Sequence, residues 1–312
     1  MPQSSHQTNT SAGKSTFVLI PVDFSPKGEL ALRVGFELAK RLELEVRLLH
    51  ASTMANPTLL PQFPDDFYGM DNENEEIEEV ELENEVRSID EHAMAKLKKA
   101  IESKQNEGFF PPVLFQTAIA PGMPEEVISE YCQISKVSVI VMATRGKDKR
   151  REELIGSVTA EVIDHAFAPV FTVPEEYTFK GFKQIVRICT FCYFDDGDKA
   201  SIAHLMDMFG NPDIKVWLYP ATDKLKGDKL LLSLKNLQKE LAEMYPNDEF
   251  IIPEIPDDAN LRKEVEKFFI KEDIQMILAP NRKRNAISRF FNPGLPHKIL
   301  YELDFPMLAI PV

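Results

Sequence analysis

Short apolar runs alternate with longer amphipathic segments through the first 174 residues of the chain. Apolar runs of this length predict buried strands, whereas apolar positions spaced three to four residues apart predict helices. The strands are expected at 17–22, 44–50, 113–118, 137–142 and 169–173. The helices are expected at 30–42, 77–101, 123–134 and 156–166. Strands that alternate with helices in this way form a parallel sheet covered by helices on both faces.

The same order begins again after a linker at 174–183. Strands are expected at 184–191, 214–219, 249–253, 275–279 and 306–310, and helices at 198–209, 225–244, 260–270 and 295–301. Two segments also agree in sequence between the passes: Val139–Ala143 with Gln275–Ala279, and Ala168–Pro174 with Phe305–Pro311. We therefore predict an α/β fold with two tandem open, mostly parallel five-stranded sheets. The expected divisions are a disordered tail at 1–16, a first domain at 17–174 and a second domain at 184–312.

Composition narrows the class of protein. Hydrophobic residues make up 44% of the 312 residues and charged residues 28%, which is typical of a globular protein. The formal charge of −14 repels phosphate backbones and anionic lipids, so we expect neither nucleic acid nor membrane partners. No apolar run approaches the roughly 20 residues that span a bilayer, and the first residues carry no apolar signal core. With three unevenly spaced cysteines, these features predict a cytoplasmic protein.

Catalytic motifs are missing from the sequence. Cys189 and Cys192 form a C-x-x-C, but within a predicted strand their side chains should face opposite sides of the sheet. The six histidines are scattered, and His50 at a strand end is expected to bond to backbone. The chain has no G-x-S-x-G, P-loop or H-E-x-x-H motif. These absences predict that the chain has no catalytic centre.

The segment from Asp71 to Glu91 is densely acidic, although apolar residues recur through it at helical spacing as far as Ile101. These positions predict one long amphipathic helix. We expect its acidic face to be solvated surface. A site for a cation or for a basic protein partner is the alternative.

The polar loop after the strand at 137–142 combines glycine, hydroxyl and basic side chains. Glycine lets the backbone approach a ligand closely, and the first N–H groups of a helix bind anions. In an open parallel sheet, ligands bind at the carboxyl ends of the strands, where this loop lies. The residues at its two ends are Met142, Ala143, Arg145, Gly146, Gly156, Ser157 and Val158. They predict a phosphate-binding loop, and the alternative is that both glycines merely allow a turn and a close helix–sheet contact.

This loop resembles that of the universal stress proteins, in the branch that binds adenine nucleotides. That branch has Gly, two residues, Gly, nine residues, Gly and then Ser or Thr, which Gly146, Gly156 and Ser157 match. The opening Pro21–Ser25 is similar to the end of that family's first strand. The resemblance implies a Rossmann-like fold of the adenine nucleotide alpha hydrolase type. It also implies a nucleotide site formed by Pro21, Val22, Asp23, Ala51, Met142, Ala143, Arg145, Gly146, Gly156, Ser157 and Val158.

In that family the aspartate lies against the adenosine and the glycine loop wraps the phosphates. One departure is Ala143, which stands where the family has its first loop glycine. In the second pass, the position that matches Asp23 is about Phe191 or Cys192, and the loop after residue 279 lacks the glycine that matches Gly146. We therefore expect ATP or another adenine nucleotide, with or without Mg²⁺, in the first domain only. The resemblance implies at most slow ATP hydrolysis, for which Asp23 is a weak candidate base.

Two functions follow from this resemblance. The first is a stress protein that responds to adenine nucleotide and acts on an unknown protein partner. The second is an interaction or scaffold protein that binds no nucleotide and works through its acidic helix. Because relatives pair through their fifth strands, we also expect strands 170–173 and 307–310 to pair with each other as an internal pseudo-dimer, and a homodimer remains open.

Overall fold

The computed structural model describes residues 16–25, 28–53, 75–144, 157–165, 167–210, 213–221, 227–254, 261–281 and 305–312; for 75–85, 157 and 261–263 it describes the backbone alone. The strands are β1 (Phe17–Pro21), β2 (Glu45–Ser52), β3 (Phe115–Pro121), β4 (Val137–Thr144), β5 (Val170–Pro174), β6 (Arg187–Cys192), β7 (Lys215–Pro220), β8 (Glu249–Ile251), β9 (Met276–Asn281) and β10 (Met307–Pro311). The helices are α1 (Glu29–Leu42), α2 (Glu75–Asn106), α3 (Pro124–Ile134), α4 (Ser157–His165), α5 (Asp196–Phe209), α6 (Gly227–Met244) and α7 (Leu261–Lys271), with a short 3₁₀ turn at Phe182–Gln184.

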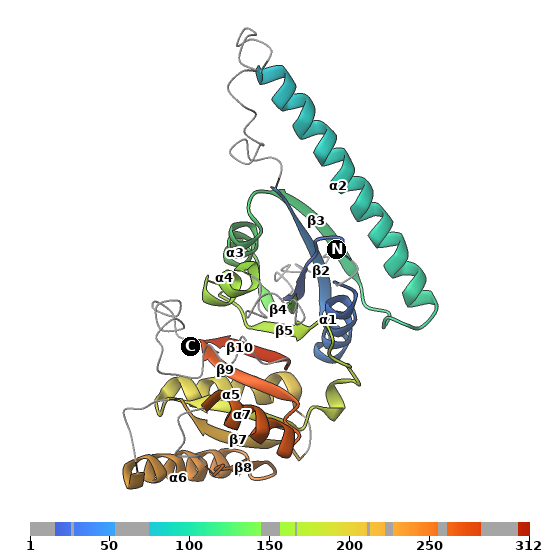
Figure 1. The fold of residues 1–312 in the computed structure, drawn as a ribbon. Helices are drawn as coiled ribbons and strands as arrows, with labels where there is room; N and C mark the ends of the chain where they lie inside the picture. The colour runs from blue at the N-terminus through green and yellow to red at the C-terminus, as the bar shows by residue number, and fades with distance from the viewer. Residues whose placement is uncertain are drawn as a thin grey trace, which may run out of the picture.

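All the strands belong to one sheet, with the order β3-β2-β1-β4-β5-β10-β9-β6-β7-β8. Strands β1 to β5 form its first half and β6 to β10 its second half, one above the other in Figure 1. Within each half the strands are parallel, as predicted. The expectation of two separate sheets was wrong, because β5 and β10 pair and join the halves into ten strands.

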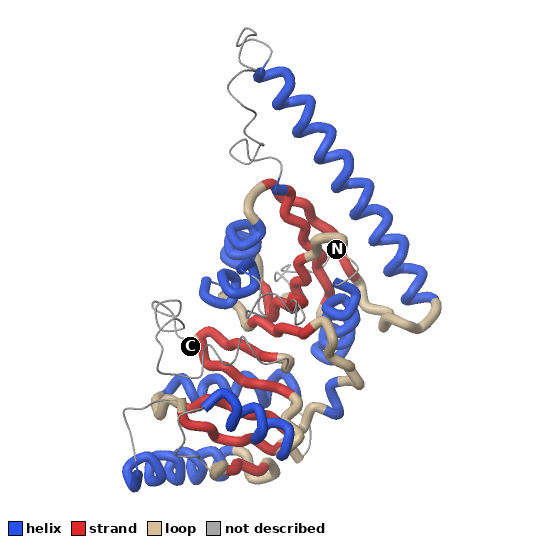
Figure 2. The backbone as a smooth tube through the Cα atoms, in the orientation of Figure 1, coloured by secondary structure: helices blue, strands red, loops and turns tan. Residues whose placement is uncertain are grey.

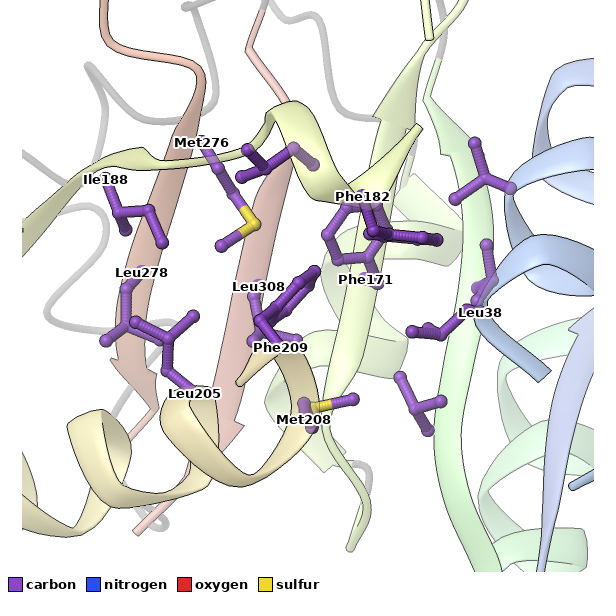
Figure 3. Close-up of a cluster of buried hydrophobic side chains, with 14 of the residues drawn as sticks. Leu38, Phe171, Phe182, Ile188, Leu205, Met208, Phe209, Met276, Leu278 and Leu308 are labelled. Atoms are coloured by element: carbon purple, nitrogen blue, oxygen red, sulfur yellow. The ribbon is translucent and has the colours of Figure 1, made fainter. Parts of the chain in front are cut away.

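The pairing of β5 with β10 is antiparallel and confirms the predicted contact between the last strands of the two passes. In its register Leu308 lies opposite Phe171 and Ala309 opposite Val170. Behind these strands Phe171, Phe182 and Phe209 converge, with ring centroids 5.3 to 6.2 Å apart. Figure 3 shows these rings beside Leu308 and Met208 at the junction of the halves. One apolar core therefore continues from the first half into the second.

Helices cover both faces of the sheet, as a buried parallel sheet requires. One face packs against α1, α5, α6 and the C-terminal part of α2, and the other against α3, α4 and α7. Figure 2 shows the helices flanking the strands in this arrangement. Cys192 lies in the apolar core on the first of these faces and Cys189 in the core on the second. This confirms that the C-x-x-C sulfurs face opposite sides of the sheet.

Helix α2 is longer than predicted and projects past the sheet (Figure 1). Its inner stripe packs tightly at Met94 and Ile101, which are 4% and 1% exposed, whereas Ile89 is 60% exposed. The helix predicted at 295–301 lies outside the described residues. Among the helices that the structure describes, none has the length and hydrophobicity needed to cross a membrane.

Candidate functional site

Strand β1 lies between β2 and β4 in the sheet: β2 and β3 follow on one side of it, and β4 and β5 on the other. Helix α1 packs on one face of the sheet and α4 on the other, so the connections after β1 and β4 lie on opposite faces. We call the edge between these two strand ends the first crevice, because ligands bind there in open parallel sheets. Leu19 pairs with Ile140, and the two parallel strands end nearby, at Pro21 and Thr144. The structure thus brings the predicted residues at the ends of β1 and β4 to one edge of the sheet.

Val22 and Asp23 leave β1 in a short, ordered turn. The Val22 N–H donates to the carbonyl of Leu49 at 2.9 Å, which ties the turn to β2. The exposed Asp23 carboxylate accepts from the Ser25 N–H at 3.0 Å through Oδ1. Phe24 adopts a left-handed backbone with φ of 57°, which is uncommon for a bulky residue. This bend turns the chain away from the strand and leaves Asp23 at the edge of the crevice.

His50 and Asp90 connect this turn to α2, and the sequence analysis did not identify their pairing. His50 Nδ1 lies 2.8 Å from the Val22 carbonyl, which confirms the predicted backbone contact, and Nε2 lies 3.3 Å from Asp90 Oδ1. Phe24 packs on the imidazole with ring centroids 4.3 Å apart. The imidazole thus bridges the turn after β1 and helix α2 through its two ring nitrogens.

Asp90 lies outside the acidic face that was expected to be solvated, and its side chain is only 14% exposed. A signal for this was present in the sequence. Asp90 lies at helical spacing with Val86, Met94 and Leu97, on the stripe that faces the sheet. A charged residue on an otherwise apolar stripe predicts a buried partner.

The remaining predicted residues divide into two groups. Ala51 lies in β2 opposite Ala120, and Met142 and Ala143 lie in β4 opposite Thr172 and Val173. Ser157 is the first residue of α4, and Val158 packs partly buried against the core. Arg145, Gly146 and Gly156 lie outside the described residues. The structure therefore describes the strand that precedes the predicted loop and the helix that follows it, and not the loop itself.

The corresponding edge of the second half has the same backbone. Phe17 pairs with Glu45 and Arg187 with Lys215, and the same number of residues separates each pair. The left-handed Phe24 corresponds to Phe194, which has φ of 64°. The position that matches Asp23 is thus Tyr193 rather than the predicted Phe191 or Cys192, and it still carries no carboxylate.

A different carboxylate lies inside this second turn. Asp198, in the first turn of α5, is fully buried. It accepts from the N–H of Tyr193 at 2.9 Å and from that of Phe194 at 2.6 Å. Beside it, a Cβ on Gly197 would lie only 3.0 Å from the Val312 side chain. At the end of β9, the Asn281 amide donates to the Ile163 carbonyl of α4. The second crevice is therefore packed with the chain's own groups.

A separate cavity of about 640 Å³ lies between α2 and β3. Its walls combine apolar side chains with a charged rim, formed by Ser52, Val86, Arg87, Glu91, Met94, Ala95, Lys98, Thr117, Ala118, Ile119 and Pro121. None of the predicted site residues that the structure describes lines it. The cavity is thus distinct from the edge formed by β1 and β4.

The titratable groups offer little catalytic chemistry. Burial raises the pKa of the Cys132 thiol to about 12 and that of Cys189 well above its usual range. Such thiols are poor nucleophiles because the thiolate is the reactive form. Within the part of the chain that the structure describes, no cluster of His, Cys, Asp and Glu has the composition of a metal site.

Comparison with known proteins agrees with this fold. Residues 16–174 match the model of the Universal stress protein family. The chain is 30% identical over 157 residues to universal stress protein MJ0577 of Methanocaldococcus jannaschii, covering 50% of this chain and 93% of that protein. It is 27% identical over 161 residues to universal stress protein YxiE of Bacillus subtilis, covering 50% and 97%.

Solved structures extend the similarity to both halves. A universal stress protein from Archaeoglobus fulgidus aligns with a TM-score of 0.64 at 13% identity, covering 96% of this chain and 99% of that one. The protein PA1789 of Pseudomonas aeruginosa aligns with a TM-score of 0.54 at 11% identity, covering 95% and 92%. At this identity the likeness concerns the fold alone.

Proposed function

Because the chain belongs to the universal stress protein family, we propose that its first half binds an adenine nucleotide and that the protein acts as a nucleotide-responsive regulator in stress. The observation that carries this proposal is the open edge where β1 and β4 end side by side, with Asp23 exposed there. In parallel sheets such an edge is the usual place for a nucleotide. A cytoplasmic setting is part of the proposal, since all three cysteines are free thiols.

In this proposal the adenosine lies against Pro21, Val22, Asp23 and Ala51, beside Met142 and Ala143. The phosphates lie between the basic loop with Arg145 and Gly146 and the start of α4, where Gly156, Ser157 and Val158 supply backbone N–H groups. Mg²⁺ usually binds through phosphates and one or two carboxylates. Asp23 is the carboxylate that this edge offers to it.

The regulatory part of the proposal rests on the contact between the site and α2. His50 contacts both the Val22 carbonyl and the Asp90 carboxylate, so a ligand that moves Val22 also moves the anchor of α2. Since α2 projects past the sheet (Figure 1), a change at its base alters a surface that a protein partner can reach. We propose slow ATP hydrolysis as the upper limit of any enzymatic activity.

Isothermal titration with ATP, AMP and cyclic AMP tests the proposal. We expect wild type to bind at least one of them and Gly146→Asp to lose that binding, because a carboxylate would occupy and repel the phosphate position. Gln133→Asp is the matched control, since it adds the same charge at an exposed position near the end of α3. It should bind as wild type does.

The alternative function is a scaffold that works through α2 without nucleotide. The 60% exposure of Ile89 on the projecting helix favours it, because an exposed aliphatic side chain beside acidic ones suits a protein partner. The two functions differ in the same titration. Equal and undetectable binding in wild type and Gly146→Asp would leave only the scaffold.

A further inference from the structure

We infer that Asp198 is a built-in occupant of the second crevice, and that Gly28, its counterpart in the first half, is the residue that keeps the first crevice open to nucleotide. This inference rests on the proposed function for its second part, because it concerns which half accepts the ligand. Its first part concerns Asp198 alone and stands on the structure of the second half.

The two positions are equivalent in backbone. The N–H of Gly28 donates to the Ser25 carbonyl at 3.2 Å, and the N–H of Asp198 donates to the Asp195 carbonyl at 3.2 Å. Each turn follows a left-handed phenylalanine, Phe24 or Phe194, by the same interval. A side chain at position 28 would therefore start from the same place as the side chain of Asp198.

The Asp198 carboxylate fills its turn completely. Both of its oxygens accept from the Tyr193 N–H, at 3.1 and 2.9 Å, and one also accepts from the Phe194 N–H at 2.6 Å. A carboxylate with no exposed surface requires such donors to offset its lost hydration. Its hydrogen bonds satisfy two backbone N–H groups that a ligand would otherwise meet.

The first half lacks this carboxylate. Gly28 is the N-cap of α1 and makes no side-chain cap, and a Cβ built there meets no atom of the described residues within 4 Å. No described residue accepts from the N–H of Asp23 or Phe24, the counterparts of Tyr193 and Phe194. In the proposal, these two N–H groups and the space beside Gly28 receive an acceptor atom of a nucleotide.

The difference therefore predicts which substitution closes the first crevice. A carboxylate at position 28 would bond to the N–H groups of Asp23 and Phe24, as Asp198 does to its own turn. It would also add negative charge next to Asp23 and repel the phosphates.

The test is ATP titration of the full chain with Gly28→Asp, with Gln133→Asp as the matched control, since it adds the same charge at an exposed position near the end of α3. We expect Gly28→Asp to weaken ATP binding at least tenfold and Gln133→Asp to stay within about twofold of wild type. Unchanged binding in Gly28→Asp would overturn the role of Gly28. An equal loss in Gln133→Asp would also overturn it, because the effect would then be one of net charge.

Amide hydrogen exchange tests Asp198 without any nucleotide. Asp198→Ala should lower the protection of the Tyr193 and Phe194 amides at least tenfold, whereas Asp196→Ala, on the same helix turn but fully exposed, should leave it unchanged. Asp198→Asn keeps one acceptor oxygen and should show an intermediate loss, which provides a reading if the alanine variant does not fold. Gly28→Asp should gain protection at Asp23 and Phe24.

These outcomes separate the two proposals. If wild type binds no ATP while Asp198→Ala loses protection at the Tyr193 and Phe194 amides, the proposed function is wrong but the role of Asp198 as the occupant of the second crevice stands. If the Tyr193 and Phe194 amides stay fully protected in both Asp198 variants, Asp198 is not the occupant of the second crevice, even if the first half binds ATP.

Discussion

The two halves of the sheet share a backbone but differ in what lies at the carboxyl ends of their strands. In the first half, no described residue fills the space beside Gly28 in the turn after β1, and the carboxylate of Asp23 is exposed. In the second half, the matching turn after β6 surrounds the buried carboxylate of Asp198. A repeated scaffold therefore does not imply a repeated site, because one side chain decides whether the turn's N–H groups face a ligand or the protein itself.

The largest effect on stability is expected at the seam, the junction where β5 pairs with β10 and the two halves meet. Phe171→Ala should lower the free energy of unfolding by about 3–5 kcal/mol, because Phe171 is 1% exposed and packs on Phe182 and Phe209 from beyond the junction. Urea unfolding followed by circular dichroism and by fluorescence measures it. Trp217, the single tryptophan, lies in β7 and reports on the second half.

Phe36→Ala is the matched control, equally buried but stacked on Phe110 within the first half. If the halves unfold as one unit, both variants shift the Trp217 transition together with the dichroism transition. A Trp217 transition that Phe36→Ala leaves in place would mean that the halves unfold independently.

A smaller effect is expected at Asp164 on α4, next to the Ile163 carbonyl that binds Asn281 across the seam. Burial raises the pKa of the Asp164 carboxyl to about 6. The folded protein thus holds this proton more tightly than the unfolded chain, and the stabilisation present at low pH is lost as pH rises through about 6. Asp164→Asn should be more stable than wild type by about 1 kcal/mol at pH 7.5, after allowance for partial exposure.

The difference between Asp164→Asn and wild type should shrink as pH falls toward 4, which thermal unfolding across pH measures. Asp164 is buried only in part and its Oδ1 has no hydrogen-bond partner among the described groups. A stability difference that does not change with pH would contradict a raised pKa.

The smallest effect is expected at the contact between the first crevice and α2. Asp90→Asn should lower stability by about 0.5–1 kcal/mol and increase hydrogen exchange in α2 around residue 90. The control is Glu91→Gln, whose side chain is 60% exposed and pairs with the 77% exposed Arg87. In the second half Pro220 stands where His50 stands in the first, so no imidazole links that turn to a helix. Hydrogen exchange in the second half should therefore not change in Asp90→Asn. Equal exchange in both variants would contradict the anchoring of α2.

Much of the fold could be predicted because its signals are local. Apolar runs such as Val137–Met142 predicted β4, and helical spacing predicted α2. The ends were less exact where the signal is weak. Helix α2 continues to Asn106 through polar residues that carry no periodicity, and β8 ends at Ile251, two residues before Pro253. The structure has one sheet in place of two because β5 pairs with β10, which lies far from it in sequence. The resemblance predicted this pairing, whereas the local pattern does not contain it.

The site was predicted less completely, because its decisive features are tertiary. The glycine loop and Asp23 come from the resemblance alone and stay a prediction, whereas the predicted absence of a matching carboxylate after β6 agrees with Tyr193 at that position. The role of Asp198 could not be found, since a buried carboxylate at a helix start looks in sequence like an ordinary cap. The pairing of His50 with Asp90 required knowing that α2 crosses the end of β2.

The antiparallel join between β5 and β10 has a consequence for access. It turns the second half end for end while keeping its helices on the same faces, so the two crevices open toward opposite rims of the molecule. A macromolecule that approaches the rim where β1 and β4 end meets the carboxyl ends of the first half's strands but the amino ends of the second half's strands. The second crevice can therefore be filled by its own side chains without changing the surface that this macromolecule contacts.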